Sequence, residues 1–373
     1  MTFRMRPGPA TFSLAALAIA LALGAALSAC FSKSESSGGA AAGPVKSLPT
    51  VAWKLASAYP ANWPVLGETG TYVTSQIASN TGNRFSIEFN DPGKLMSATD
   101  ALDAVSKGTV DALWGSSRVW AAKNPALALF ASVPFGPAAT DYLGWIYQGG
   151  GRLLWQELMA KQNVWPVPCG LAPSAGGGWF LDELKRTDQL RGMKIRMDGL
   201  SGAVFGKLGA TVLELEGEDV AVALEKGVLQ GASSSVPTLD EKAGLQKVAK
   251  FYYFPGWEQR TLLLALMINL DKWKALAPAD QGMIESVCRD AILQSFTYGE
   301  ANQVQAVARI RAEGVQVQPW PSDFLRAFKR ALDDVAKEQT AKSADFGKVW
   351  NSLVRYRQGT AEWSKLTAVP DLN

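Results

Sequence analysis

Histidine is absent from this 373-residue chain, and cysteine occurs only three times. Without histidine the chain has no imidazole for a Ser-His-Asp or Cys-His catalytic arrangement, and none for a metal site of that kind. The formal net charge is only +3, and no block of lysine and arginine suggests a surface that follows a phosphate backbone. Nucleic acid is therefore not an expected partner.

Long apolar runs are also scarce. One lies near the N-terminus, and the next best, Thr261 to Ile268, is only as long as a β-strand. Hydrophobic residues nevertheless make up 47% of the chain and charged residues 19%, which is typical of a globular protein. Residues 48–373 are enough for two domains of ordinary size.

The N-terminus has the layout of a secretory signal. Arg4 and Arg6 give a positive start, an apolar run extends from Leu14 to Leu27, and Leu27-Ser28-Ala29-Cys30 closes it. This tetrapeptide resembles a bacterial lipobox, in which the cysteine is lipidated and becomes the first mature residue. An uncleaved anchor helix is the alternative, but the run is shorter than the roughly 20 residues that span a bilayer. We expect residues 1–29 to be removed.

Residues 30–47 begin with Cys30 and continue as a segment rich in Ser, Gly and Ala. Such a composition cannot bury a core, so we interpret it as a flexible tether that spans roughly 20–25 Å on average. The protein is thus expected at the periplasmic face of the cell envelope, lipid-anchored through Cys30.

The other two cysteines, Cys169 and Cys288, fall in an expected strand and an expected long helix. A disulfide between them and two buried thiols are both compatible with the sequence, because spacing does not reveal distance in the fold.

Strand and helix patterns alternate in the first part of the chain. Ser97 has the character of an N-cap and Gly108 that of a helix stop. The short spacings favour a parallel sheet with right-handed crossovers. Strands are predicted at 51–55, 85–89 and 110–114, and helices at 68–79 and 98–107.

The same pattern occurs again later. Residues 104–117 (AVSKGTVDALWGSS) align with residues 223–235 (ALEKGVLQGASSS): both end a helix at Lys-Gly, pass through a short apolar strand and run into serines. Strand, helix and strand patterns at 193–197, 201–208 and 211–215 precede the second copy. We therefore expect two related α/β lobes.

The ends of these strands are the expected ligand site, because ligands bind beyond the carboxyl ends of strands in open parallel sheets. Facing lobes would bring residues 115–118 and 233–235 to opposite walls of a cleft. Arg196 ends the strand 193–197 and belongs to the same edge. A solvated strand-end charge is the alternative for Arg196, and serine is common at strand ends without any ligand.

A long helix is predicted from Pro278 to Glu313, with Gly314 as its stop. Its length of roughly 50 Å exceeds one small lobe, so we expect it to run along both.

Five segments, in this order along the chain, resemble the solute-binding subunits of tripartite ATP-independent periplasmic (TRAP) transporters. They are 54–68 (KLASAYPANWPVLGE), 128–136 (ALFASVPFG), 176–180 (GGGWF), 190–197 (LRGMKIRM) and 251–257 (FYYFPGW). The last segment, together with the helix at 147–159, is most similar to the branch that binds α-keto acids with a cation.

The resemblance implies a periplasmic-binding-protein architecture: two α/β lobes, joined by hinge strands and crossed by a long helix. Lobe I would comprise 48–172 and 257–300, and lobe II 173–256 and 301–373 with the C-terminal helix. The chain would be no enzyme, but would capture an organic acid between its lobes and deliver it to TRAP membrane permease subunits. A homodimer through the C-terminal helix is also implied.

The same resemblance implies the role of Arg196, which ends the motif that reads GMKIR here and holds the ligand arginine in the family. A guanidinium offers a carboxylate two charge-assisted hydrogen bonds in a fixed orientation. Arg196 is therefore the expected carboxylate anchor.

The sequence departs from the α-keto-acid branch at several ligand-facing positions. Ala175 stands where the branch has a glutamine, and Ser233 and Ser234 stand where it has an acid and a tryptophan. Loss of the tryptophan at 234 removes a large apolar wall, so a roomier pocket is expected.

A further departure lies directly after the Pro-Gly-Trp motif at residues 255–257. Trp257 is followed by Glu258 and Gln259, which places the carboxylate one residue earlier than in the branch. Hard cations need several oxygen ligands, and hydroxyl oxygens are weaker ligands than carboxylates. A bound cation is therefore in doubt, no cofactor is expected, and Glu258 remains the candidate metal ligand.

Arg118 occupies a position where the branch commonly has tyrosine. A second guanidinium in the cleft would favour a dianion, a sulfonate or a carboxylate with a second polar end. The alternative is that Arg118 points to solvent or pairs with a local acid.

Two other functions fit some of these features. A sensory co-receptor would have the same fold and ligand but a signalling partner. A Ser/Lys lipoprotein hydrolase would use Ser233 or its neighbours with Lys226 or Lys242, although no nucleophile-elbow motif flanks them.

Overall fold

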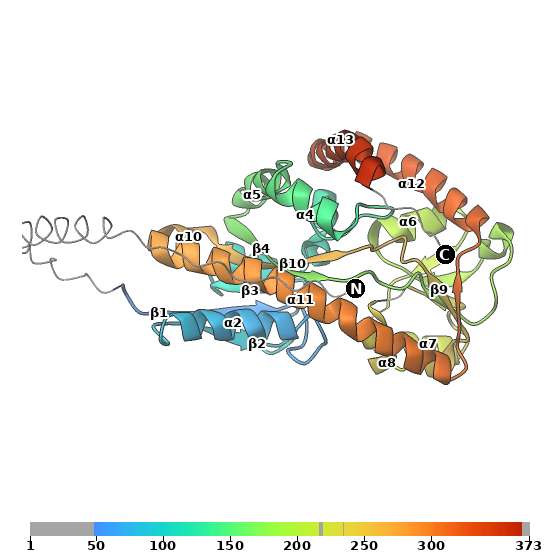
Figure 1. Cartoon of the computed structure of the whole chain (residues 1–373), viewed down its shortest axis with the longest axis horizontal. Coiled ribbons are helices and arrows are strands. Elements are labelled where there is room, and N and C mark those ends of the chain that lie inside the picture. Colours follow the sequence, from blue (N-terminus) through green and yellow to red (C-terminus); the bar gives the residue numbers. More distant parts are fainter. Residues whose placement is uncertain (1–47, 216–218, 234, 368–373) are drawn as a thin grey trace, which may run out of the picture. The chain divides into compact units, whose positions relative to one another are not determined.

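Two β-sheets organise the described part of the chain, which comprises residues 48–215, 219–233 and 235–367 of a computed structural model (Figure 1). The first sheet has the strand order β2-β1-β3-β10-β4, and the second has the order β11-β9-β5-β8-β6-β7. Helices accompany both sheets, which confirms the predicted α/β class with two lobes. The predicted signal segment, Cys30 and Ser234 lie outside the described residues.

The first sheet, which defines lobe I, is mixed rather than wholly parallel. β1 pairs in parallel with β2 and β3, as the strand–helix spacing predicted. β10 instead runs antiparallel to both β3 and β4, because it returns from the other lobe and does not follow a crossover helix. The strands are β1 (Val51–Ser57), β2 (Phe85–Asn90), β3 (Ala112–Gly115), β4 (Val164–Ala172) and β10 (Leu262–Asn269).

The second sheet, which defines lobe II, has the predicted parallel pairing around β6. This strand pairs in parallel with β7 and β8, whereas β5 runs antiparallel to β8 and β9. The strands are β5 (Trp179–Phe180), β6 (Lys194–Arg196), β7 (Thr211–Leu213), β8 (Gly231–Ala232), β9 (Phe251–Phe254) and β11 (Gln316–Pro319).

The shorter helices predicted at 68–79 and 201–208 lie close to their expected positions, whereas the one expected at 147–159 begins only at Gly151. The start of the helix predicted at 98–107 also needs a correction. Ser97 is not a helix N-cap: its hydroxyl accepts from the Asp100 backbone N–H at 3.2 Å in a preceding turn, and the helix begins at Ala101. In the first lobe the shorter helices are α2 (Glu68–Asn80), α3 (Ala101–Ser106), η2 (Ser117–Trp120), η3 (Pro125–Phe130), α4 (Ala139–Tyr147), α5 (Gly151–Ala160) and α10 (Leu270–Ala275). In the second they are η4 (Thr187–Leu190), α6 (Gly199–Lys207), α7 (Asp219–Glu225), α8 (Pro237–Lys242) and α9 (Leu245–Val248).

The repeated sequence occupies corresponding places in the two sheets. α3 leads into β3 past Gly108, and α7 leads into β8 past Gly227. Both glycines have positive φ, 74° and 68°, a conformation that glycine adopts without a Cβ clash. β3 and β8 each lie inside their sheet, so the residues after them emerge at corresponding strand ends.

Two chain segments cross side by side between the sheets, one from β4 to β5 and the other from β9 to β10. The Ala175 N–H donates to the Gln259 carbonyl at 3.0 Å, and the Gly177 N–H donates to the Tyr253 carbonyl at 2.7 Å. The Thr261 hydroxyl adds a bond to the Ala172 carbonyl at 3.0 Å. We call residues 173–178 and 255–261 the two hinge segments.

The predicted long helix is α11 (Pro278–Ala312), which begins with proline at its first position (Figure 1). It contacts α2 and β4 of the first lobe and α8 and β11 of the second, so it runs along both lobes as predicted. In the second lobe Arg309 forms a two-bond ion pair with Glu241 of α8, at 2.6 and 2.7 Å. Neither α11 nor any other described helix is long and apolar enough to cross a membrane.

Where α11 passes the first hinge segment, it carries a buried glycine. A Cβ on Gly299 would lie 2.7 Å from Pro173 Cδ, closer than real Cβ contacts come. Glycine at this position therefore lets the helix approach the hinge segment directly.

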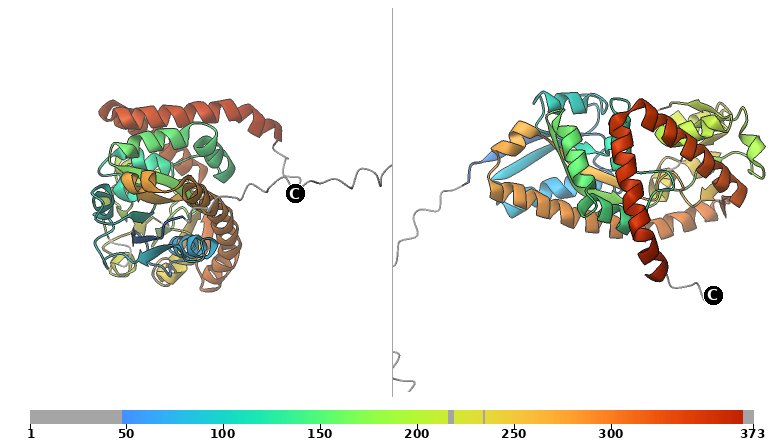
Figure 2. Two further views of the ribbon diagram at one scale, coloured as in Figure 1. Left: turned by 90° about the vertical axis from the view of Figure 1, so that its left-hand side faces the viewer. Right: turned by 90° about the horizontal axis from the view of Figure 1, so that it is seen from above.

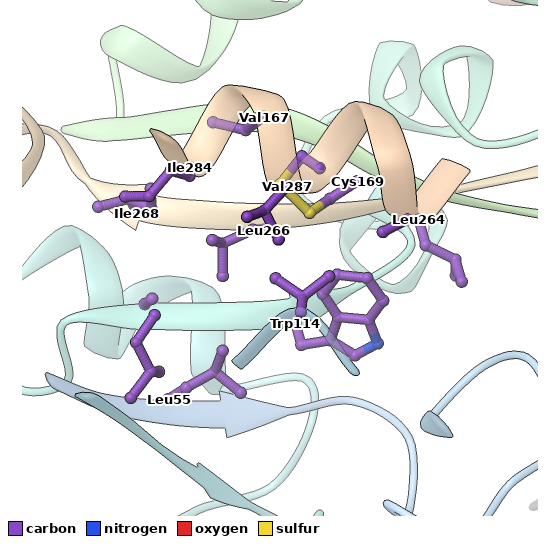
Figure 3. Packing of buried hydrophobic residues seen from close by; sticks show 14 of the residues in the cluster. Leu55, Trp114, Val167, Cys169, Leu264, Leu266, Ile268, Ile284 and Val287 are labelled. Carbon is purple, nitrogen blue, oxygen red and sulfur yellow. A yellow bond between two sulfur atoms is a disulfide. The ribbon is translucent and has the colours of Figure 1, made fainter. Parts of the chain in front are cut away.

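The first lobe also holds α11 covalently. Cys169 of β4 and Cys288 of α11 form a disulfide, within a core that includes Leu266 and Val287 (Figure 3). Both cysteines are fully buried. The structure thus selects the disulfide from the two alternatives that the sequence left open.

The chain ends in two helices, α12 (Ser322–Lys342) and α13 (Ala344–Thr367), which follow one another at an angle (Figure 2). α12 packs on α6 of the second lobe. α13 instead contacts η3, α4 and α5, and its Phe346, Val349 and Leu353 belong to an apolar cluster of the first lobe. The sequence had grouped residues 301–373 with the second lobe, but the apolar face of α13 is covered by the first.

We expect replacement of both Cys169 and Cys288 by alanine to lower the free energy of unfolding by about 2–5 kcal/mol. The bond closes a loop of 119 residues and so restricts the unfolded chain. Denaturant unfolding of the full chain measures the effect. Cys30→Ser is the matched control, because it removes the third cysteine and leaves this bond in place. Two free thiols from residues 169 and 288 in the unreduced, denatured wild type would contradict the prediction.

Candidate ligand-binding site

Arg196 ends β6 with its guanidinium held on three sides. Nη2 forms an ion pair with Asp198 at 2.9 Å, Nη1 donates to Ser233 Oγ at 2.8 Å, and Nε donates to the Leu215 carbonyl at 3.3 Å. The side chain is 22% exposed. The sequence placed Arg196 and Ser233 at one edge of the sheet, and the structure brings them into direct contact.

These contacts leave part of the guanidinium available. A guanidinium carries five N–H donors, and the hydrogen bonds to described residues use one on Nη1 and the one on Nε, while Nη2 forms the ion pair with Asp198. The contacts with described residues thus engage only some of these donors, and a guanidinium can bind a carboxylate through two of them.

The segment after β8 is fixed from both sides. The Ser233 N–H donates to the Arg196 carbonyl at 2.7 Å, and the Ser235 carbonyl accepts from the Gly176 N–H at 3.1 Å. The ends of two parallel strands are therefore tied to each other and to the first hinge segment.

Arg118 lies in η2, directly after β3 of the first lobe. Ser117 before it is buried and donates its hydroxyl to the Leu127 carbonyl at 2.8 Å, which fixes the start of this turn. Arg118 itself is exposed, and its Nη1 donates to Gln259 Oε1 at 3.1 Å. The structure thus shows contact with the second hinge segment rather than a local ion pair, while the exposure of the side chain also fits the solvent-facing alternative, so a ligand role for Arg118 stays a prediction.

The candidate residues of the hinge segments are buried. Ala175 is fully buried, and the exposed fractions of Trp257, Glu258 and Gln259 are 2%, 7% and 4%. Gln259 joins the groups together, because its side chain accepts from Arg118 and its carbonyl accepts from Ala175.

Trp257 lies in an aromatic cluster at the junction of the lobes. Its ring centroid is 5.3 Å from Phe135 of the first lobe, and 6.0 and 4.5 Å from Phe205 and Phe328 of the second. The Phe135 N–H also donates to the Trp257 carbonyl at 2.6 Å. In this structure the ring packs between the lobes rather than lining an open space.

Two hollows are present elsewhere on the described surface. One of about 570 Å³ lies between α12 and α13 and includes Lys337 and Trp350. The other, of about 440 Å³, lies between α2 and α11 and includes Tyr72 and Tyr298. The candidate site is therefore defined by strand ends and hinge contacts, and not by either hollow.

The contacts of the described residues do not form a Ser/Lys pair. Ser233 Oγ accepts from Arg196, and Lys242 Nζ donates to the Asn62 carbonyl of the first lobe at 2.9 Å. Lys226 is exposed at the end of α7. The arrangement of Ser233 is that of a group which positions a guanidinium.

Comparison with known protein families agrees with this geometry. Residues 55–343 match the family described as "DctP: Bacterial extracellular solute-binding protein, family 7". The chain belongs to this family. Its members are solute-binding proteins, and the family is extracellular, in agreement with the expected position outside the cytoplasm.

A curated relative with a stated ligand class is also similar to this chain. The chain is 33% identical to the "monocarboxylate 2-oxoacid-binding periplasmic protein" of Nostoc over 319 residues, which cover 86% of this chain and 87% of the relative. This similarity and the family match confirm the resemblance to TRAP solute-binding proteins near the 2-oxoacid branch.

Solved structures share the fold. A TRAP solute-binding protein of Bordetella bronchiseptica, with calcium and picolinate bound, has a TM-score of 0.81 and 30% identity, covering 86% of this chain and 95% of its own. One of Pseudoalteromonas atlantica, with sodium and pyruvate bound, has a TM-score of 0.80 and 25% identity, covering 85% and 97%.

In this solute-binding protein, sequence reasoning missed the acid that supports the site. Asp240 of α8 is only 3% exposed. Its Oδ2 accepts from Trp179 Nε1 at 2.9 Å and from the Tyr252 hydroxyl at 2.8 Å, and its Oδ1 accepts from the Ser235 N–H at 2.7 Å. The one signal in the sequence was an acid in the first turn of a helix that begins with proline.

We expect Asp240→Asn to lower the free energy of unfolding by about 2–4 kcal/mol, because the amide nitrogen cannot accept the bonds that the carboxylate oxygens accept. Denaturant unfolding followed by tryptophan fluorescence measures the loss. Asp182→Asn, at an exposed position of the same lobe, is the matched control and should be within about 0.5 kcal/mol of wild type. Equal stability of the two variants would refute the supporting role of Asp240.

Proposed function

We propose that this protein captures an organic carboxylate between its lobes and delivers it to the membrane permease of a TRAP transporter. The observation that carries the proposal is the Arg196 guanidinium, which Ser233, Asp198 and Leu215 hold at the end of β6. The bound picolinate and pyruvate of the relatives are both carboxylates, which supports this class of ligand. Ala175, Gln259 and Arg118 complete the proposed site, with Trp257 behind them and Ser234 next to Ser233.

Closure of the lobes is the proposed binding step. The hinge segments connect the lobes through backbone hydrogen bonds, and rotation about such segments is a common form of domain closure. A ligand held by both lobes stabilises the closed population by its higher affinity for that state. The bond from Lys242 of α8 to the Asn62 carbonyl is a direct link between the lobes that closure would favour.

Delivery requires the protein to stay near its permease. We propose that Cys30 carries the lipid and that residues 30–47 act as the tether, so that the protein searches for the permease in two dimensions. We also propose a homodimer through α13, where Trp363 and Leu366 are 68% and 75% exposed near the helix end.

The proposal is tested by thermal unfolding of the purified full chain against pyruvate, 2-oxobutanoate, lactate, picolinate, succinate, malate and 2-oxoglutarate. A ligand present at 100 times its Kd adds about 2.7 kcal/mol to the free energy of unfolding, which raises Tm by a few degrees. At least one carboxylate should do so, whereas the amide of the same acid should not. No shift with any carboxylate would refute the proposed ligand class.

Replacement of Arg196 by alanine should weaken binding of that carboxylate by about 2–5 kcal/mol, the usual cost of breaking a buried charged hydrogen-bonded pair. Calorimetric titration measures the change. Arg186→Ala is the matched control, because Arg186 lies in the same lobe but is 76% exposed and paired with Asp188. Unchanged affinity in the Arg196 variant would show that the carboxylate anchor lies elsewhere.

A further inference from the structure

The relatives hold a metal ion together with their acid, calcium with picolinate in one and sodium with pyruvate in another. The oxygen donors of the described residues at the candidate site do not suit such an ion. Calcium takes six to eight oxygen ligands, most often carboxylates, carbonyls and waters. Within the described residues no cluster of three or more His, Cys, Asp or Glu side chains is arranged to hold a metal.

The individual positions explain the poor fit. Ala175 presents a methyl group, and Ser233 Oγ already accepts from the Arg196 guanidinium. Gln259 Oε1 accepts from the Arg118 guanidinium at 3.1 Å. Two of the oxygens that could bind a metal ion, Ser233 Oγ and Gln259 Oε1, thus each accept a hydrogen bond from an arginine instead. Glu258 adds a single buried carboxylate.

We propose that the Arg118 guanidinium supplies the positive charge that a metal ion supplies in those relatives. This inference rests on the proposed function, because it concerns the same ligand. The carboxylate bound by Arg196 then has a second charged group opposite it without any metal, and the favoured substrate class is a dicarboxylate or another acid with a second anionic group.

The positions of the two arginines support this class. Arg118 follows strand β3. Ser233, which accepts a hydrogen bond from Arg196, follows strand β8, and these two strands correspond in the repeated unit of the two lobes. Arg118 bonds to Gln259 and Gln259 to Ala175, while the neighbouring Gly176 bonds to the Ser235 carbonyl, so both strand ends are tied to the same hinge segment. The contact with Gln259 uses one of the five donors of Arg118, so its guanidinium can hold Gln259 and bind a ligand oxygen together.

The test is calorimetric titration of the full chain with succinate and 2-oxoglutarate as dianions, and with butanoate and 2-oxobutanoate as matched monoanions. Each titration is made in sodium-free buffer with a chelator, then with added calcium chloride, and then with added sodium chloride. We expect the dianions to bind at least about 10-fold more tightly than the monoanions, and the added cations to change Kd by less than about 3-fold.

Two variants assign the effect to Arg118. Arg118→Gln keeps a donor for Gln259 but removes the charge, and it should weaken dianion binding about 10- to 100-fold and monoanion binding by a smaller factor. Arg118→Lys keeps the charge and should restore part of the loss. Unchanged far-ultraviolet circular dichroism and Tm of the free variants show that they fold.

The outcomes separate the two proposals. Binding of a monoanion that requires calcium or sodium would overturn the metal-free inference and leave the proposed function intact. Equal effects of Arg118→Gln on dianions and monoanions would overturn it as well. Failure of every acid, with or without cations, would overturn the proposed function itself.

Discussion

Backbone hydrogen bonds hold the two hinge segments together and set the positions of Ala175 and Gln259, the candidate ligand residues between the two lobes. The segments approach so closely that a Cβ on Gly256 would lie 2.1 Å from the Ala175 carbonyl oxygen. Because the bonds from Ala175 and Gly177 use only backbone atoms, they do not depend on which side chains the segments carry. This arrangement gives a physical reason why the fold is shared with relatives while ligand-facing side chains at 175 and 259 differ from the expected pattern.

The charges of the two arginines affect how readily the lobes would close. In the proposed binding mode each lobe contributes one guanidinium, so closure without a ligand would bring two positive groups toward each other at a cost in free energy. Asp198 offsets part of the charge of Arg196, but it is half exposed and lies on the same strand end. An anion between the lobes reverses the sign of the interaction. In this binding mode the charge of the ligand itself couples binding to closure, in addition to the hydrogen bonds that each guanidinium forms.

Local signals made much of this fold predictable from the sequence. Apolar periodicity located β1, α2 and α11, and the Lys-Gly helix ends revealed the repeat whose strands carry the site residues. Pairings between distant residues left no such signal. The antiparallel return of β10, the Cys169–Cys288 bond and the packing of α13 on the first lobe depend on tertiary contacts. Asp240 was missed for the same reason, since Trp179 lies 61 residues away.

The long helix α11 is attached to both lobes. Its N-terminal arm is bonded covalently to the first lobe through Cys288, and its C-terminal arm is held to the second lobe by Arg309 and Glu241. Between these attachments α11 packs against the first hinge segment at Gly299, where a Cβ would lie only 2.7 Å from Pro173 Cδ. In the proposed closure, rotation of the lobes would bend the helix in the turns around this glycine, the residue whose missing side chain makes a helix easiest to deform. The point at which α11 would bend and the hinge segments between the lobes therefore coincide.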